Sequence, residues 1–181
     1  MRRRARPVLL ALAVCTVCGA ASASARTGGG RPAPGDVRTC ATRGDSVRPA
    51  TPPAGGTAVG LIVLWKVTSL SPTADAAWPY AQKMPAVVPA RVRVTLAIAP
   101  ESTGVAALWK RGGGYVSAVR FVACRERERA WTYDGTVGRY TQFPFAIALK
   151  QPSACVVMQA WVDGEAAPHT VTVGIGRRDC V

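Results

Sequence analysis

Short apolar stretches separated by turn residues occupy most of the chain from Thr57 onward. Residues 91–98 show the strictest alternation, in which one face is made by Val92, Val94, Leu96 and Ile98. A repeat of two is the mark of a β-strand, because successive strand side chains point to opposite faces. The pattern therefore predicts a strand with one face in a core.

The same criteria predict six further strands. They lie at residues 59–67, 115–124, 129–133, 143–149, 156–162 and 171–175. The first is almost continuously apolar, which suits a strand covered on both faces. The others put one apolar row inward, and the two clearest rows are Phe143, Phe145, Ile147, Leu149 and Val156, Met158, Ala160, Val162. Only residues 73–83 favour a helical turn, which Pro79 limits.

Glycine and Asp-Gly turns separate these strands, at residues 112–114, 134–135 and 163–164. About seven strands at this spacing predict an all-β fold, an antiparallel β-sandwich. An immunoglobulin-like topology is the preferred version, and a small closed β-barrel is the alternative.

The first 25 residues have the features of an export signal. Arginines open the segment, an apolar stretch runs from Pro7 to Val17, and Ala23-Ser24-Ala25 permits cleavage before Arg26. The apolar stretch is shorter than the roughly 20 residues of a membrane span. A secreted product is therefore expected. The alternative, a lipid anchor at the cell surface through Cys15 or Cys18, has valine before each cysteine where a small residue is preferred.

Two parts follow the signal. Residues 26–56 are rich in proline and glycine, without a helix or strand period, and predict an irregular arm that carries Cys40. Residues 57–181 form the predicted β domain.

Four cysteines remain after cleavage: Cys40, Cys124, Cys155 and Cys180. An even number in an exported chain indicates disulfides, and the spacing fits no zinc site. If the last two strands form a hairpin, Cys155 lies near residue 176 or 177, so pairing with Cys180 needs only a modest bend. Cys40 then pairs with Cys124. Two other connectivities are possible for four cysteines.

Basic residues outnumber acidic ones, 23 to 10, for a net charge of +13. A basic region centred on Arg91, Arg93, Lys110 and Arg111 predicts attraction to anionic envelope polymers or lipid headgroups. The chain carries no nucleic-acid motif, and export also argues against that partner.

Aromatic residues suggest a second binding surface. Trp161 should face away from the inward row of its strand, beside Gln159, and Trp131, Tyr133 and Tyr140 cluster around a turn. These rings could form a platform for sugars or for a partner protein. The alternative is that Trp131 and Trp161 pack under a loop or in the interior.

Catalytic chemistry is not indicated. His169 is the only histidine and fits a hydrogen-bonded surface position, and no G-x-S-x-G motif is present. Glu126 and Glu128 alternate with arginines, which favours a solvated run over a raised carboxyl pKa. No catalytic residue, metal ligand or cofactor is predicted.

The C-terminal third resembles a group of short exported actinobacterial proteins. The residues that carry the resemblance are Phe121-Val122-Ala123-Cys124, Tyr140-Thr141-Gln142-Phe143-Pro144-Phe145, Cys155, and Val171 to Gly176 with Cys180. Proteins of this group are small secreted β domains stapled by cysteines and are generally uncharacterised. The resemblance covers residues 115–181 and implies export and a cysteine-stapled fold, without a catalytic residue.

The expected function is a secreted, non-enzymatic binding or accessory module at or outside the cell envelope. Its partner would be an anionic envelope polymer, a polysaccharide or another secreted protein. One alternative is a hydrolase of cell-wall polysaccharide that uses Glu126, Glu128 or Asp134. Another is an inhibitor or interaction domain that presents residues 134–142.

Overall fold

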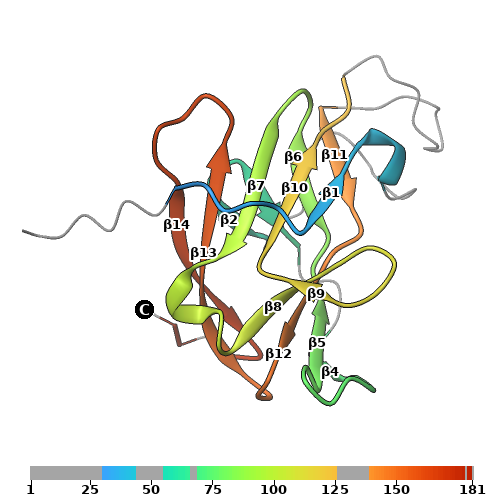
Figure 1. Ribbon diagram of the computed structural model, residues 1–181, viewed down its shortest axis with the longest axis vertical. Coiled ribbons are helices and arrows are strands. Elements are labelled where there is room, and N and C mark those ends of the chain that lie inside the picture. The colour runs from blue at the N-terminus through green and yellow to red at the C-terminus, as the bar shows by residue number, and fades with distance from the viewer. Residues whose placement is uncertain (1–29, 44–54, 66–68, 126–138, 178, 181) are drawn as a thin grey trace, which may run out of the picture.

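The computed structural model describes residues 30–43, 55–65, 69–125, 139–177 and 179–180. This part of the chain is all-β, with fourteen short strands (Figure 1). Its helical segments are two 3-10 turns, η1 (Cys40–Thr42) and η2 (Pro100–Ser102), and neither approaches the length needed to cross a bilayer. The strands are β1 (Asp36–Arg38), β2 (Thr57–Val59), β3 (Ile62–Leu64), β4 (Ser71–Pro72), β5 (Tyr80–Lys83), β6 (Ala86–Pro89), β7 (Arg93–Ile98), β8 (Ala106–Trp109), β9 (Tyr115–Val116), β10 (Ala118–Val122), β11 (Tyr140–Phe143), β12 (Ala146–Leu149), β13 (Ala154–Val162) and β14 (His169–Ile175).

Five strands form the front sheet, in the order β1-β10-β7-β13-β14. All its pairings are antiparallel except β1 with β10, which is parallel. The nine-residue β13 is the longest strand of the described part and pairs on both sides, with Met158 opposite Ile98 and Val156 opposite Val173. The front sheet therefore unites strands from both ends of the chain.

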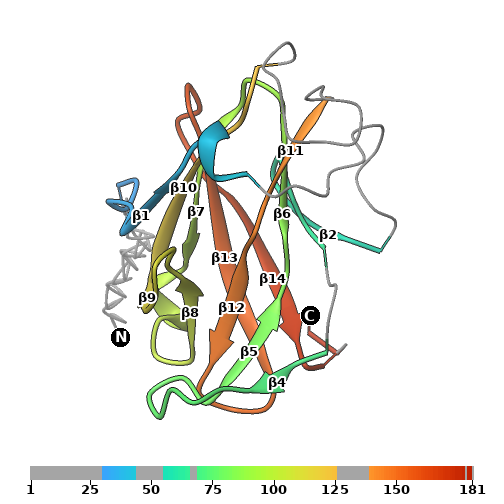
Figure 2. The same ribbon diagram turned by 90° about the vertical axis from the view of Figure 1, so that its right-hand side faces the viewer.

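The opposing rear layer consists of two sheets, β11-β6-β3-β2 and β4-β5-β12-β8-β9. They share one ladder, because β5 pairs with β12 in the same register in which β6 pairs with β11. Pro85 and Pro144 interrupt this ladder, where one backbone bond from Met84 N to Phe145 O bridges the break. Figure 2 shows β6 running on into β5 and β11 into β12.

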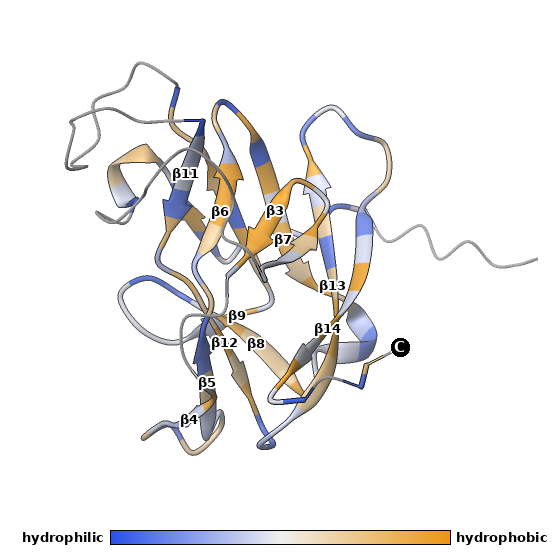
Figure 3. Cartoon of the chain, turned by 180° about the vertical axis from the view of Figure 1, so that it is seen from behind, coloured by the Kyte–Doolittle hydropathy of each residue, from blue (hydrophilic) through white to orange (hydrophobic). Residues whose placement is uncertain are grey.

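The core lies between the front sheet and the rear layer. The inward rows expected from the sequence are confirmed: Phe143, Phe145, Ile147, Leu149, Val156, Met158, Ala160 and Val162 are all buried. Phe121 of β10 meets two rear-layer rings, at 5.2 Å from Phe143 and 5.6 Å from Phe145. Strands β3 and β6 are mostly apolar, whereas β11 carries polar residues (Figure 3). The antiparallel β-sandwich is thus confirmed, and the sheets are open rather than closed into a barrel.

Three expectations about individual segments were wrong. The single strand expected at residues 59–67 is a hairpin of β2 and β3, because Gly60 has a φ of 56° and turns the chain. The helical turn expected within residues 73–83 is a tight turn at Asp75–Trp78 followed by β5. The arm expected to be irregular contributes β1 to the front sheet.

The described part therefore holds more and shorter strands than the seven expected. Turns and the two prolines of the rear layer divide most apolar stretches into strands of two to six residues, and only β13 and β14 are longer in the described part. The strand expected at residues 129–133 lies outside the described residues, as does the export signal. The immunoglobulin-like topology stays a prediction.

Both expected disulfides are present, Cys40–Cys124 and Cys155–Cys180. The register of the last hairpin differs from the expected one, because Cys155 pairs with Gly174 and not with residue 176 or 177; the turn that follows brings Cys180 back to Cys155. Cys40–Cys124 fastens the arm to the end of β10, so the arm is part of the domain.

Arg38 of β1 extends into the space between the two layers and is 1% exposed. Its guanidinium donates to the carbonyl oxygens of Pro144 and Trp109 and to the carboxylate of Asp36. It also lies over the rings of Trp109, Phe145 and Phe121, at 5.0, 5.5 and 6.0 Å from their centroids. The rear-layer ladder is interrupted at Pro144, and Arg38 supplies a hydrogen-bond donor to the Pro144 carbonyl oxygen there.

Candidate anion-binding groove

A groove of about 660 Å³ opens at the end of the front sheet where the arm is fastened by its disulfide. Residues from η1, the turn before β7, and the ends of β7 and β10 line it. We call it the arginine groove, and its lining residues are Thr39, Cys40, Arg91, Arg93, Val122, Ala123 and Arg125.

The backbone around Arg91 explains how the first arginine reaches the groove. Arg91 has a φ of 68°, the one non-glycine residue of the described part in this region. The conformation costs about 1–2 kcal/mol for an L-residue. Two hydrogen bonds to the end of β10 offset that cost, from Arg91 N to Cys124 O at 2.9 Å and from Ala123 N to Val92 O at 2.9 Å.

The disulfide forms a rigid wall of the groove. Cys124 is fully buried, and its N–H donates to Thr141 Oγ1 at 2.9 Å. On the other side, Arg43 Nη1 donates to Cys40 O at 2.6 Å. The covalent bond thus brings η1 against the end of β10 and places Arg125, the next residue after Cys124, at the groove.

Among the described residues, the charged ones that line the groove are all arginines. Arg91, Arg93 and Arg125 are exposed, and no carboxylate lines the groove in the described part of the chain. Four carboxylates that the structure describes are paired elsewhere: Asp36 with Arg38, Asp163 with Arg31 and Arg120, Glu165 with His169, and Asp179 with Arg177. Three guanidinium groups around one hollow suit an anion, because each can bind a phosphate or carboxylate with two parallel hydrogen bonds.

The structure divides the basic region expected from the sequence. Arg91 and Arg93 lie together in the groove, but Lys110 and Arg111 lie in the turn between β8 and β9 and do not line it. There the Arg111 N–H donates to Asp36 Oδ2 at 3.1 Å. The expectation of a single basic region was wrong, because β-sheet pairing separates residues that net charge alone groups together.

The structure places two of the four residues of the expected aromatic platform, Trp161 and Tyr140, and does not bring these two together. Trp161 does face away from the core row of β13, but it is 8% exposed and has no open ring face for a ligand. Tyr140 is half-buried on β11, in the rear layer, and therefore on a different sheet. Trp131 and Tyr133 lie outside the described residues.

The titratable candidates give no reactive arrangement in the part of the chain that the structure describes. His169 is exposed at the start of β14, and its Nε2 lies 2.6 Å from Glu165 Oε2. That is the hydrogen-bonded surface position expected for it. Across the described ranges, no three His, Cys, Asp or Glu side chains come together to hold a metal. Glu126, Glu128 and Asp134 lie outside these ranges.

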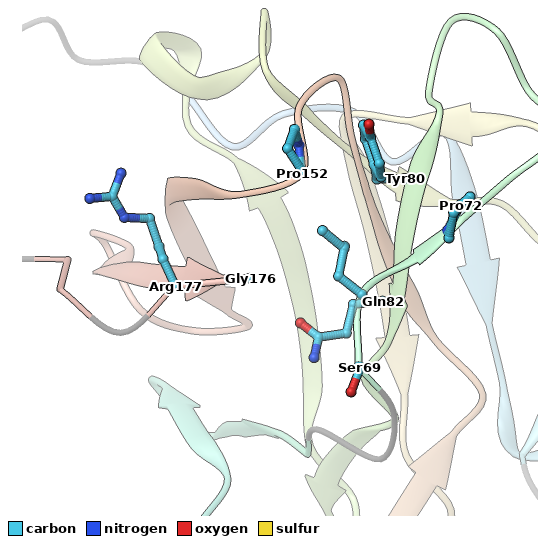
Figure 4. Close-up of a pocket in the computed structure, with 8 residues that line it drawn as sticks. Ser69, Pro72, Tyr80, Gln82, Pro152, Gly176 and Arg177 are labelled. Carbon is cyan, nitrogen blue, oxygen red and sulfur yellow. The ribbon is translucent and has the colours of Figure 1, made fainter.

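A second hollow of about 470 Å³ lies at the opposite end of the sandwich (Figure 4). Tyr80 and Gln82 of β5 line it together with Arg177, which follows β14. Arg177 already donates two hydrogen bonds to Asp179, at 2.7 and 2.6 Å, and Figure 4 shows it apart from Tyr80. Because one arginine lines this hollow and three line the arginine groove, this hollow is the weaker candidate for an anion.

The sequence pattern did not single out Arg125 or Arg43 as binding residues. Arg125 opens an alternating run of charges that is typical of a solvated hairpin end. The position of Arg125 directly after Cys124 was the available signal, since the expected Cys40–Cys124 bridge brings the arm next to Arg125.

No protein-family model, curated protein or solved structure matches the chain.

Proposed function

We propose that the protein is a secreted, non-enzymatic binding or accessory module that holds an anionic polymer of the cell envelope in the arginine groove. The observation that carries this proposal is the meeting of three exposed arginines, Arg91, Arg93 and Arg125, around one hollow. A polymer with repeated phosphate or carboxylate groups would present successive charges to such a cluster.

Several features support an extracellular site of action. The first 25 residues have the composition of an export signal. Two disulfides are formed, and such bonds persist in oxidising compartments. The resemblance to short secreted actinobacterial domains and the immunoglobulin-like arrangement of strands belong to the same proposal.

The non-enzymatic part of the proposal rests on the chemistry of the groove. Its charged side chains within the described residues are all guanidinium groups, which stay protonated at neutral pH. Such groups bind and orient anions but do not exchange protons as general acids or bases. The arrangement therefore favours retention of a ligand over its conversion.

The test compares two variants that remove equal charge from the mature chain, residues 26–181. Arg93→Gln with Arg125→Gln alters the groove, whereas Lys110→Gln with Arg111→Gln alters the β8–β9 turn. Binding to a purified polyol-phosphate wall polymer is measured from 50 to 500 mM salt, with dextran as the neutral control. We expect the groove variant to bind at least about tenfold more weakly, since each arginine near a polyanion contributes about 1 kcal/mol.

The control variant should keep its affinity within about twofold, and wild-type binding should weaken steadily with salt. Equal loss in both variants would show that net charge alone attracts the polymer. That result, or wild-type protein that does not bind at 50 mM salt, would refute the proposal.

A further inference from the structure

The outer face of the front sheet is crossed by the first described residues of the arm. We call residues 30–35 the strap (Figure 1). At one end, Arg31 Nη2 donates to the carbonyl oxygens of Val162 at 2.7 Å and Trp161 at 3.3 Å, both on β13. At the other end, Gly35 N donates to Ala118 O of β10 at 2.9 Å. Because β7 lies between β13 and β10, the strap must pass over β7.

One row of residues lies across these three strands. Thr95 of β7 is opposite Trp161 of β13 on one side and Arg120 of β10 on the other. Their side chains face away from the core, yet Thr95 is 0% and Trp161 8% exposed. We call Thr95, Arg120 and Trp161 the strap face, because the strap crosses them.

Two polar atoms of the strap face lack partners. Thr95 Oγ1 and Trp161 Nε1 are buried without a hydrogen bond. A buried unsatisfied polar group is unfavourable, and such groups are few in native proteins. The strap does not satisfy them: Pro32 and Pro34 have no N–H to donate to Thr95 Oγ1, and no carbonyl oxygen of the strap accepts from the Trp161 indole N–H. The strap therefore covers two polar groups of the strap face without forming hydrogen bonds to them.

The covering segment is held by charge. Asp163, at the end of β13, lies between two arginines, with Arg31 Nη1 at 2.5 Å and Arg120 Nη2 at 2.6 Å. All three side chains are about one-third exposed or less. The ion pairs that hold the strap are thus partly accessible to solvent. A competing ligand or a single substitution can therefore break them.

We propose that the strap face is a saccharide-binding site that the strap occupies in the unliganded protein. A tryptophan ring next to a hydroxyl and an Arg–Asp pair suits a sugar, whose ring has an apolar face and whose hydroxyls both donate and accept. Pro32 and Pro34 of the strap carry apolar rings and no hydroxyl groups. A sugar in their place would add partners for Thr95 Oγ1 and Trp161 Nε1.

The site adjoins the arginine groove. Arg93 lines the groove, and Thr95 lies two residues further along β7 on the same face; Val122 and Arg120 have the same relation on β10. Same-face residues of a strand are about 7 Å apart. The saccharide site is inferred independently of the proposed function. Only the idea that one anionic envelope polymer occupies both sites rests on the proposed function.

The first test opens the strap with Arg31→Gln and uses Arg177→Gln as the matched control, since Arg177 is an exposed arginine with its own carboxylate partner. Hydrogen exchange of the Trp161 indole N–H is followed by NMR, with the signal assigned from Trp161→Phe. We expect exchange at least about tenfold faster in Arg31→Gln and unchanged in the control. Unchanged exchange in Arg31→Gln would show that the strap does not cover the site and would overturn the inference.

The second test measures binding of the neutral hexamer of β-1,4-linked N-acetylglucosamine by calorimetry. We expect Arg31→Gln to bind at least about fivefold more tightly than wild type, because less of the binding energy goes into displacing the strap. Thr95→Val keeps the shape of the side chain and should weaken that binding several-fold in the Arg31→Gln background. No binding to Arg31→Gln, or binding unaffected by Thr95→Val, would overturn the inference.

The two proposals fail separately. The hexamer carries no charge, so its binding does not depend on the arginine groove. The arginine groove binds the phosphate groups of the polyol-phosphate polymer, so that binding does not need a sugar ring. Loss of hexamer binding with polymer binding intact would reject the saccharide site alone.

Discussion

At the scale of single residues, Arg38 shows how a charge can be kept inside a small apolar core. Burial lowers the pKa of its guanidinium, and the neighbouring Asp36 carboxylate raises it. Arginine retains its proton even so, because its ordinary pKa lies far above neutral pH. Its three acceptors and the surrounding rings replace the water it has lost.

Arg38→Met should lower the free energy of unfolding by about 3–5 kcal/mol. The apolar side chain keeps much of the volume, but it leaves the carbonyl oxygens of Pro144 and Trp109 without the donor that Arg38 supplies and Asp36 without its charged partner. Urea denaturation of the oxidised protein provides the measurement. Arg177→Met, on the surface, is the control and should leave the midpoint unchanged. A loss below about 1 kcal/mol for Arg38→Met would contradict the role given to this residue.

At the scale of elements, the strap is held to the front sheet mainly through Asp163. Burial acts to raise the pKa of Asp163, but hydrogen bonds and charge from Arg31 and Arg120 outweigh burial and leave the pKa below its ordinary value. A carboxyl with a lowered folded-state pKa stabilises the fold above its unfolded pKa of about 4. That contribution is lost as the pH falls through the lower folded value.

The strap should therefore stay attached from pH 7 to pH 5 and loosen below about pH 4. Backbone amide signals of Arg31, Ala33 and Gly35 report this in an NMR titration. Asp163→Asn should loosen the strap at neutral pH and remove the acid transition of these signals. An acid transition that persists in Asp163→Asn would assign it to another group.

At the scale of the whole molecule, two disulfides fasten different parts of the sandwich. Cys40–Cys124 spans 84 residues and joins the arm to β10, whereas Cys155–Cys180 spans 25 and closes the chain end onto β13. In the chain-entropy model the longer loop contributes about 4–5 kcal/mol and the shorter about 3. Either value is a large part of the stability of a domain of this size.

Replacing Cys40 and Cys124 by alanine should therefore destabilise the protein more than replacing Cys155 and Cys180. Only the first pair of substitutions should also weaken polymer binding, because Cys40 lines the arginine groove. Denaturant midpoints and the polymer-binding assay measure the two effects. The reverse order of stability, or equal loss of binding, would contradict this division of roles.

The strands that could be predicted are those whose own residues carry the pattern. Residues 93–98, 146–149 and 154–162 alternate or are apolar over enough positions for the inward row to be chosen locally. The Cys155–Cys180 pairing followed from the register of one hairpin, which is also a local property. β1 was missed because its three residues have no period of their own and become a strand only through parallel pairing with β10.

The candidate site was predictable only in part. Arg91 and Arg93 were found because they flank a recognisable strand, but net charge could not separate them from Lys110 and Arg111. The outward direction of Trp161 followed from alternation along β13. Its burial agrees with the alternative that Trp161 packs under another segment, but the covering segment could not be identified, because the strap comes from about 130 residues earlier in the chain.

The sequence by itself determined the all-β class and the inward rows, because each depends on the period of neighbouring residues, and it favoured the disulfide pairing through the spacing of the last hairpin. Tertiary structure alone decided that Arg125 joins Arg91 and Arg93 around one groove and that the arm lies over Trp161. Those features depend on strand order and on pairing between segments far apart in the chain. Neither leaves a periodic trace in the residues that make it.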